Sequence, residues 1–268
     1  MEKEILTMEE AAELFGVSVK TFIKLLKEEK VPARKIGREW RFSRKALIDW
    51  LSSGDSQIYS SSEGEAKDFF NEVAPEWETI RKNYYDESIK NKLINLNILK
   101  KNMSLIDLGA GDGYISRAVA KLVKKVVAVD ISGEMLKQLK KKAQEEGIRN
   151  IETSETDGQD IPVKDSSIDV VCANMYLHHI EEPGIAIKEM YRVIKPGGIV
   201  FLADFNQHSD RELKEKMHDI WPGFNNDEIK KWFSENGFEN ISIEVLAGEN
   251  GSGEGKTRAG IFVLTAKK

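Results

Sequence analysis

The chain reads Leu105-Ile106-Asp107-Leu108-Gly109-Ala110-Gly111-Asp112-Gly113 where a short apolar run passes into a glycine-rich turn. A helical pattern follows directly, at 114–123. Glycine adopts backbone angles that other residues avoid, and it lets a ligand approach the main chain closely. In open α/β sheets such a turn lies at the carboxyl ends of the strands, where ligands bind. We therefore expect a ligand site here.

Strands and helices alternate on both sides of this turn. Apolar runs predict strands at 104–108, 125–129, 151–154, 168–173, 198–204, 241–246 and 261–265. Amphipathic runs predict helices at 65–74, 86–99, 114–123, 133–146, 182–194, 209–219 and 227–236, and Val193–Gly198 predicts a helix-to-strand turn. This alternation is typical of βαβ units with helices on both faces of the sheet. The expected fold class is α/β, with a Rossmann-like, mostly parallel sheet of seven strands.

The glycine spacing argues against a dinucleotide ligand. The dinucleotide fingerprint is G-x-G-x-x-G, but here the third glycine falls one residue early and Tyr114 takes its place. Asp112 would also put a negative charge at a helix N-terminus, which normally favours an anion. Asp130, at the end of the next strand, can accept hydrogen bonds from ribose hydroxyls. These residues favour a ligand that has a ribose but no phosphates.

Two further signals follow the third and fourth strands. Asp157 and the backbone N–H of Gly158 could form hydrogen bonds with the edge of an adenine. The segment 174–179, which follows the fourth strand, contains an asparagine, a tyrosine and two histidines. Each signal alone has an ordinary explanation, such as a helix cap, a turn or surface histidines. All of them fall at strand ends in order along the chain, and this favours one shared site.

The first 51 residues have a different pattern. Thr7 and Glu10 predict a capping box, and Gly16 and Ser18 predict the turn between two helices. A short hairpin, or wing, is expected around Gly37, before a third helix. This pattern predicts a winged helix-turn-helix domain at 1–51, a Ser/Gly-rich linker at 52–64 and a second domain at 65–268.

Charge and composition limit the kinds of binding partner and the cellular location that we expect for this protein. Residues 17–45 hold ten Lys and Arg against three Asp and Glu, which indicates either a polyanion-binding face or a solvated basic surface. The single cysteine, Cys172, excludes an internal disulfide and a site of several thiolates, and no metal is expected. No apolar run reaches membrane-spanning length and the charged start Met1–Glu4 lacks a signal-peptide core, so we expect a cytoplasmic protein without a membrane partner.

Residues 65–247 resemble the class I S-adenosylmethionine-dependent methyltransferases, particularly the small-molecule branch around the ubiquinone/menaquinone-biosynthesis enzymes. The resemblance implies that the cofactor is S-adenosyl-L-methionine. It implies that Asp107 lies near the methionine amine, Asp130 on the ribose, and Asn174 near the sulfonium. The implied cofactor-binding residues are Asp107, Gly109, Ala110, Gly111, Gly113, Asp130, Ile131, Met135, Asp157, Gly158 and Asn174.

The methyl acceptor is expected to be a small molecule. DNA amino-methyltransferases carry an Asn/Asp-Pro-Pro-aromatic tetrapeptide after the fourth strand, but residues 174–177 lack both prolines. A general base is needed only if the acceptor atom carries a proton. The catalytic candidates by position are Tyr176, His178 and His179, which could equally shape the pocket without moving a proton. An aromatic cover is expected from Trp77, Tyr84, Tyr85, Trp221 and Phe224.

The first domain resembles MerR/excisionase-like helix-turn-helix modules, on the segments 6–12, 16–18, 32–37, 40–42 and 50–51. The resemblance implies that the helix at 18–30 enters the major groove of duplex DNA and that the wing touches phosphates. The implied DNA-binding residues are Lys20, Thr21, Lys24, Arg34, Lys35, Arg38 and Arg41. The alternative is a docking or dimerisation module, and a homodimer is compatible with either interpretation.

Two functions from different classes fit this sequence. The chain is either a methyltransferase with a targeting domain, or a transcription regulator that uses its methyltransferase-like domain as a ligand sensor. The cofactor motifs are the same in both cases. Turnover of an acceptor would favour the enzyme, and operator binding that responds to cofactor without turnover would favour the regulator.

Overall fold

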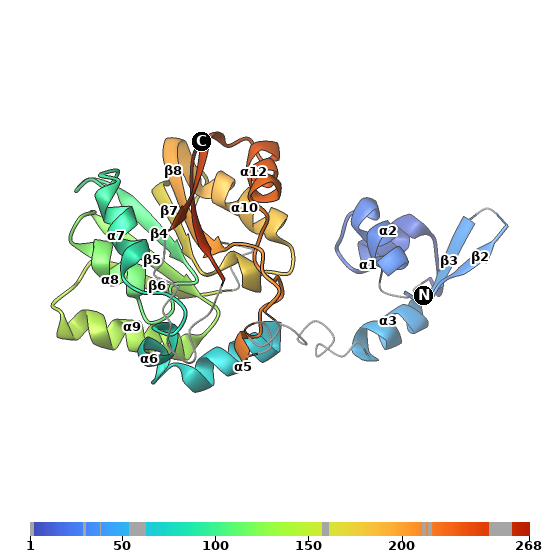
Figure 1. The fold of residues 1–268 in the computed structure, drawn as a ribbon. Coiled ribbons are helices and arrows are strands. Elements are labelled where there is room, and N and C mark those ends of the chain that lie inside the picture. Colours follow the sequence, from blue (N-terminus) through green and yellow to red (C-terminus); the bar gives the residue numbers. More distant parts are fainter. Residues whose placement is uncertain are drawn as a thin grey trace. The chain divides into compact units, whose positions relative to one another are not determined.

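The computed structural model describes residues 3–28, 31–37, 39–53, 63–156, 161–210, 213, 216–246 and 259–268. The chain divides into two compact units, Met1–Ser61 and Ser62–Lys268 (Figure 1). Most of the predicted linker at 52–64 lies outside the described residues, so its bounds stay a prediction. Within the described ranges, no helix has the length and the apolar character needed to cross a membrane.

The N-terminal unit is a helix-turn-helix with a wing, as predicted. Its elements are β1 (Ile5–Leu6), α1 (Met8–Leu14), α2 (Val19–Glu28), β2 (Arg34–Ile36), β3 (Glu39–Ser43) and α3 (Arg44–Ser53). The expected capping box is present, because Thr7 Oγ1 accepts the Glu10 N–H and Glu10 accepts the Thr7 N–H at 2.9 Å. Ser18 Oγ accepts the Thr21 N–H at 3.1 Å and so caps α2. Phe22 and Phe42 meet edge to face in the core.

Strand β1 was not predicted. It pairs antiparallel with β3 through Ile5 and Leu6 and gives a small sheet in the order β1-β3-β2. Two residues are too short to show an alternating pattern, so only the tertiary contact defines this strand.

The C-terminal unit holds the predicted sheet. Its elements are α5 (Glu63–Val73), α6 (Trp77–Arg81), α7 (Ser88–Asn95), β4 (Ser104–Leu108), α8 (Tyr114–Ala120), β5 (Lys125–Asp130), α9 (Gly133–Glu145), β6 (Ile151–Glu155), β7 (Ile168–Asn174), the 3-10 helix η1 (Leu177–His179), α10 (Pro183–Val193), β8 (Ile194–Phe205), α12 (Asn226–Glu235), β9 (Glu239–Leu246) and β10 (Ile261–Lys267). The strand order is β6-β5-β4-β7-β8-β10-β9. All neighbours from β6 to β8 are parallel, and β10 runs antiparallel to β8 and β9. The α/β fold with a mostly parallel seven-stranded sheet is confirmed.

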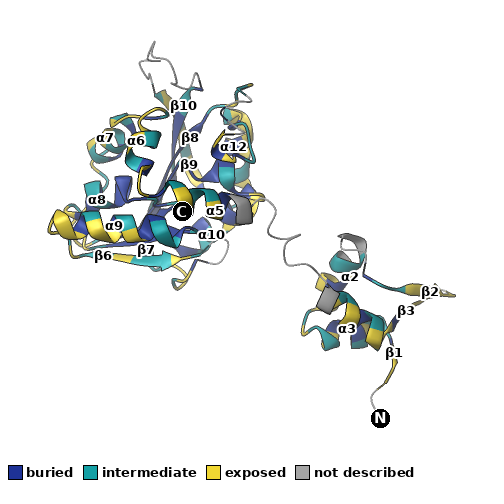
Figure 2. Ribbon diagram, turned by 90° about the horizontal axis from the view of Figure 1, so that it is seen from below, coloured by how far each residue is buried: buried dark blue, intermediate teal, exposed yellow. Residues whose placement is uncertain are grey.

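Helices cover both faces of this sheet (Figure 1). One face, with Ile106 and Val171, packs in a core that α10 and α12 complete. The other face, with Leu105 and Val170, packs under α7 and α8, and α9 covers Ala128 beside them. Figure 2 shows the central strands of the large sheet buried beneath helices whose outer faces are exposed, whereas the edge strands β6 and β9 are mostly intermediate or exposed. Because both faces are covered, the central strands are continuously apolar, and this explains why they could be predicted.

The predicted turn at Val193–Gly198 is wrong. Strand β8 begins at Ile194, directly after α10, and pairs with β7 from its first residue. The register then shifts, because Ile168 lies opposite Ile194 while Val170 lies opposite Ile199. The extra residues form a bulge with Gly197 at φ 77°, a conformation that favours glycine. Helix α6 and η1 were not predicted, and the helix expected at 209–219 lies partly outside the described residues.

We predict that Gly223→Ala destabilises the C-terminal unit more than Gly147→Ala does. Both glycines have a positive φ, near 70°, at which alanine costs about 1–2 kcal/mol. A Cβ at Gly147 meets nothing within 4 Å, whereas one at Gly223 would lie 2.7 Å from the Phe205 carbonyl oxygen. Chemical unfolding of both variants measures the difference. Equal losses of stability would show that the loop after β8 gives way freely.

Candidate active site

A cavity lies at the carboxyl ends of β4, β5 and β7. Its empty volume is about 1140 Å³, which includes the solvent-filled space at its opening. Of the predicted cofactor-binding residues, those that line it are Asp107, Gly109, Ala110, Gly111, Asp130, Ile131, Met135 and Asn174. Gly113 does not line the cavity and instead caps α8 at φ 90°, where a Cβ would lie 2.8 Å from Leu139. Asp157 and Gly158 lie outside the described residues, although the neighbouring Thr156 lines the cavity.

Asp130 joins the ends of β4 and β5. Its Oδ2 accepts the Gly111 N–H and its Oδ1 accepts the Ser132 N–H, both at 2.8 Å. Burial raises the pKa of Asp130 to about 6, although these backbone donors act to lower it. A carboxylate oxygen can accept more than one hydrogen bond. Both oxygens can therefore hold the turn and still accept from hydroxyl groups of a ligand.

Asp107 and Asn174 bring unsatisfied acceptor oxygens to the cavity. Asp107 Oδ2 accepts the Ser116 hydroxyl at 2.6 Å, while its buried Oδ1 has no hydrogen-bond partner among the described residues. The buried Oδ1 of Asn174 likewise meets no donor in the described part of the chain. A buried polar atom without a partner is costly, so a ligand that brings N–H donors or an ammonium group fits this position.

Asp112 is not the bare negative charge that the sequence suggested. Lys142, on α9, lies 2.5 Å from Asp112 Oδ2 and 2.8 Å from Glu78 on α6. Lys142 compensates part of the charge of the buried Asp112 carboxylate, which is only 1% exposed, because the same lysine also pairs with Glu78. The Asp112 charge therefore argues against phosphates less strongly than the sequence suggested. The glycine spacing and Tyr114 still separate the turn from the dinucleotide fingerprint.

The turn after β4 packs closely against the segment after β7. A Cβ on Gly109, which has φ 66°, would lie 2.8 Å from the Tyr176 ring. Met175 adopts φ 52°, an unusual conformation for a residue other than glycine, and both Met175 and Tyr176 line the cavity. Strained backbone of this kind gathers at functional sites. Tyr176 thus packs directly against the glycine turn.

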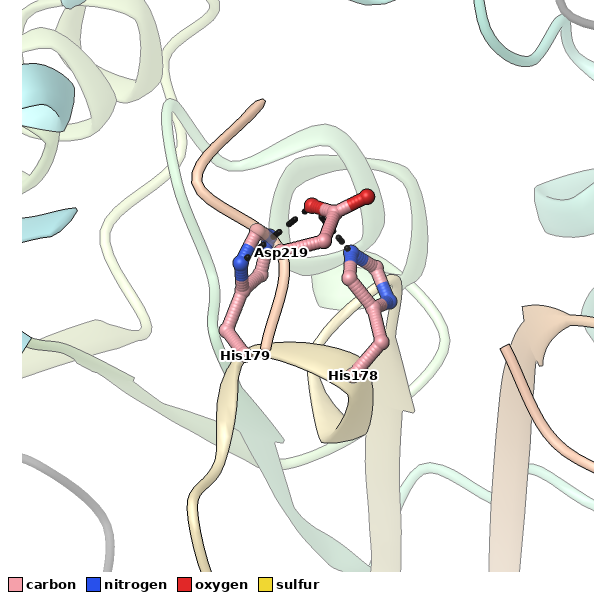
Figure 3. A group of neighbouring side chains, drawn as sticks. All are labelled: His178, His179 and Asp219. Carbon is pink, nitrogen blue, oxygen red and sulfur yellow. Dashed lines mark ion pairs between the residues drawn. The ribbon is translucent and has the colours of Figure 1, made fainter. Parts of the chain in front are cut away.

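The two candidate histidines are largely buried and meet two acidic residues, Asp204 and Asp219, that the sequence analysis missed. His178 Nδ1 lies 2.6 Å from Asp204. His178 Nε2 and His179 Nδ1 lie 3.4 and 3.6 Å from Asp219 (Figure 3). Burial acts to lower the pKa of His178, but the carboxylates of Asp204 and Asp219 outweigh it and the net direction is upward. Burial, reinforced by His178, lowers the pKa of His179 well below its usual value.

The aromatic wall of the cavity is only partly the predicted one. Trp77, Tyr84 and Tyr85 line it, together with Phe70, which was not predicted. Trp221 and Phe224 do not line it, and this part of the prediction is wrong. They pack in the core under α10 and α12, and the Trp221 indole donates to the Ile180 carbonyl at 2.9 Å. An aromatic side chain has no sequence signal that separates a core from a pocket.

The predicted DNA-binding residues divide between helix and wing. Lys20 and Thr21 on α2 are exposed. In the wing, Arg34 lies opposite Arg41 and Lys35 lies opposite Trp40. Because successive side chains of a strand point to opposite faces, Arg34 and Arg41 share one face and Lys35 lies on the other.

One basic residue of the wing already has an acidic partner. Arg41 forms an ion pair with Glu39, so part of its charge is already compensated. Arg38 and the side chain of Lys24 lie outside the described residues.

The sheet and the glycine turn of the cavity are similar to those of the class I S-adenosylmethionine-dependent methyltransferases, and family models match parts of both units of the chain. Residues 106–202 match the family described as a methyltransferase domain, and residues 5–55 match the family described as a helix-turn-helix domain. Each match falls within one of the two units.

Known relatives match the C-terminal part. The uncharacterized methyltransferase YcgJ of Bacillus subtilis is 28% identical over 116 residues, covering 43% of this chain and 46% of that protein. The ubiquinone/menaquinone biosynthesis C-methyltransferase UbiE of Wigglesworthia glossinidia brevipalpis is 30% identical over 136 residues, covering 49% of this chain and 54% of that protein. The chain thus spans about half the length of these relatives. The crystal structure of YcgJ has the same fold, with a TM-score of 0.57 at 18% identity over 68% of this chain and 99% of YcgJ.

We predict that Asp107→Asn stabilises the ligand-free protein, and more so at pH 8 than at pH 5. Burial raises the pKa of Asp107 to about 7, above the value of about 3.9 in an unfolded chain. The charged carboxylate therefore costs stability as the pH rises through this window, by about 1.4 kcal/mol per pKa unit, and the cost is full above pH 7.

Thermal unfolding at both pH values measures this effect. The exposed Asp165→Asn serves as the control for losing a carboxylate at the surface, and its unfolding temperature should follow the wild type at both pH values. A stabilisation of Asp107→Asn that does not grow with pH would contradict the assignment.

Proposed function

We propose that this chain transfers a methyl group from S-adenosyl-L-methionine to a small-molecule acceptor, and that its N-terminal domain binds duplex DNA. One observation carries the enzymatic part. The acceptor oxygens of Asp107, Asn174 and Asp130 converge on one cavity around a glycine turn, as a ligand with an ammonium group and a ribose requires. The proposal includes a cytoplasmic location, where such a cofactor and DNA both occur.

Each residue has a distinct task in this proposal. When bound, S-adenosylmethionine supplies an electrophilic methyl group on a sulfonium, and the reaction is an in-line displacement that depends on alignment. Asp107 Oδ1 accepts from the ammonium group, and Asp130 accepts from the ribose hydroxyls. Asn174 Oδ1 lies free to contact the cofactor near the reacting centre. Gly158 and Asp157 stay the predicted adenine contacts.

The walls of the cavity support a small acceptor. Phe70, Trp77, Tyr84 and Tyr85 give it apolar surface, which excludes water and suits an organic molecule. The segment after β7 lacks the two prolines of DNA amino-methyltransferases. Tyr176, His178 and His179 stay candidates for a general base. His178 has a carboxylate at each ring nitrogen, whereas His179 has the Asp219 carboxylate at Nδ1.

We predict that Asp130→Ala weakens binding of S-adenosylhomocysteine at least tenfold. Each lost hydrogen bond in a buried site contributes about 1 kcal/mol or more. Isothermal titration calorimetry with S-adenosylhomocysteine, its 2′-deoxy analogue and NAD measures this. The wild type should prefer the parent over the deoxy analogue, and Asp130→Ala should lose that preference. Asp165→Ala, an exposed carboxylate away from the cavity, is the matched control.

Two outcomes would redirect the proposal. Tight binding of NAD with none for S-adenosylhomocysteine would exclude the proposed cofactor. Binding of S-adenosylmethionine that alters DNA affinity, without turnover of any acceptor in a screen with labelled methyl groups, would make the chain a ligand-sensing regulator. Labelled methyl groups on DNA bases or protein would exclude the small-molecule acceptor.

The DNA part rests on the exposed basic residues of α2 and the wing. Lys20 and Thr21 lie near the start of α2, the helix that this class of motif places in the major groove. Arg34 and Arg41 share the outer face of the wing, opposite the face that carries the buried Phe42. A single small unit covers little DNA, so we propose a homodimer that binds two half-sites.

We predict that Arg34→Ala weakens DNA binding, while Lys35→Ala has a smaller effect. Because Arg34→Ala removes about one phosphate contact, the slope of log K against log salt concentration should become shallower by about one. Lys35 is the matched control, because it is exposed on the same strand but points to the opposite face. Lys20→Ala should relax sequence choice instead. Fluorescence anisotropy with the duplex upstream of the gene and a scrambled duplex, at low and moderate salt, measures all three. No binding at low salt would make the domain a docking or dimerisation module.

A further inference from the structure

His178, His179 and Asp219 form a compact group at the wall of the cavity. Figure 3 shows the two imidazoles and the carboxylate facing one another. One ligand atom from each residue lies within 4.8 Å of the others. Adjacent positions in η1 supply both histidines, and their ring centroids are 4.1 Å apart. The described part of the chain brings no other histidine, cysteine or carboxylate group of three or more this close.

The distances in this group suit metal ligands better than hydrogen bonds. The Asp219 oxygen lies 3.4 Å from His178 Nε2 and 3.6 Å from His179 Nδ1, which is longer than ordinary hydrogen bonds. Two ligands on a tetrahedral zinc ion, with bonds near 2.0–2.1 Å, lie about 3.4 Å apart. His179 Nδ1 is buried and has no hydrogen-bond partner among the described residues. Such an atom is costly unless a bound group satisfies it.

The surrounding residues hold the group in place. Asp204 accepts from the Leu177 and Phe205 N–H groups and meets His178 Nδ1 at 2.6 Å, so it fixes the ring and points Nε2 toward Asp219. A carboxylate on the outer nitrogen of a metal-binding histidine is the usual supporting contact. The ring of His179 makes a hydrogen bond with the backbone of His218.

The backbone fixes the third member. The His178 carbonyl accepts the Ile220 and Trp221 N–H groups, each at 3.0 Å, and so ties the segment that carries Asp219 to η1. His218, just before Asp219, adopts φ 54°, an unusual conformation that functional sites often contain. Phe70 packs edge-on against His179 and Phe205 packs against His178, which makes an apolar shell.

We propose that His178 Nε2, His179 Nδ1 and an Asp219 oxygen bind one divalent transition-metal ion, with a fourth position open to the cavity. Two imidazoles and one carboxylate suit zinc and its neighbours and disfavour magnesium or calcium, which prefer oxygen ligands. All three residues line the cavity, so water or an anionic oxygen of a bound molecule can complete the coordination. The site does not depend on the proposed methyl transfer. It competes with a general-base role, because a ligating nitrogen cannot accept a proton.

The test is direct metal binding by the untagged full-length chain. After treatment with a chelator, the protein is dialysed against zinc, and bound metal is counted by mass spectrometry. We expect one zinc per chain in the wild type and at least tenfold weaker binding in Asp219→Asn and His179→Gln. His208→Gln is the matched control, because His208 lies outside the group and should leave the zinc content unchanged. Substitution by cobalt(II) should give visible absorption that both ligand variants lose.

Thermal unfolding of the wild type with added metal tests the site without any variant, in case the ligand variants do not fold. Zinc should raise the unfolding temperature of the wild type by several degrees, since a ligand of the native state stabilises it, and magnesium should not. No zinc retained by the wild type, or equal retention in all variants, would overturn the site. S-adenosylhomocysteine affinity measured on the same samples distinguishes this failure from a failure of the proposed cofactor.

Discussion

The hydrogen bond from the Gly111 N–H to Asp130 holds the site together. It links the turn after β4 to the end of β5, and Asp130 also accepts the N–H of Ser132 at the start of α9. One buried carboxylate thus sets the positions of two strand ends and one helix, while Asp107 and Asn174 add acceptors on either side. This arrangement buries three carboxylic acids at one edge of the sheet, namely Asp107, Asp112 and Asp130, and their desolvation is unfavourable. Lys142 forms an ion pair with Asp112 and so compensates part of its charge. A site of this kind is prepared for a ligand that brings hydrogen-bond donors.

Much of the sheet could be predicted because its strands are buried on both faces. The bounds 104–108 agree with β4, and the remaining strands differ by a few residues at their ends. The predictions failed where tertiary contacts decide the structure. Strand β1 exists only through β3, and β8 begins at Ile194 because pairing with β7 continues across a bulge.

The candidate site divides in the same way. The glycine turn and Asp130 could be predicted, because the strand, the turn and the helix that form this part of the site are consecutive in the sequence. Asp219 gives no such signal, since only tertiary contacts bring it beside His178, which lies some forty residues earlier in the chain. The aromatic residues Trp77 and Trp221 look alike in the sequence, yet one lines the cavity and the other packs in the core.

The double ion pair of Lys142 has an evolutionary consequence. Glu78 is partly exposed, with 44% of its side chain in contact with solvent, so its replacement should cost less than the loss of a charge partner for Asp112. Asp112 is almost wholly buried, and a neutral residue at 142 would leave its charge without a counterion. Among descendants of this sequence, positions 112 and 142 should therefore change together, while position 78 drifts on its own. The order of substitutions is also constrained. A lineage that replaces Lys142 first passes through a less stable intermediate, because Asp112 loses its counterion. A lineage that first replaces Asp112 with a neutral residue avoids this intermediate.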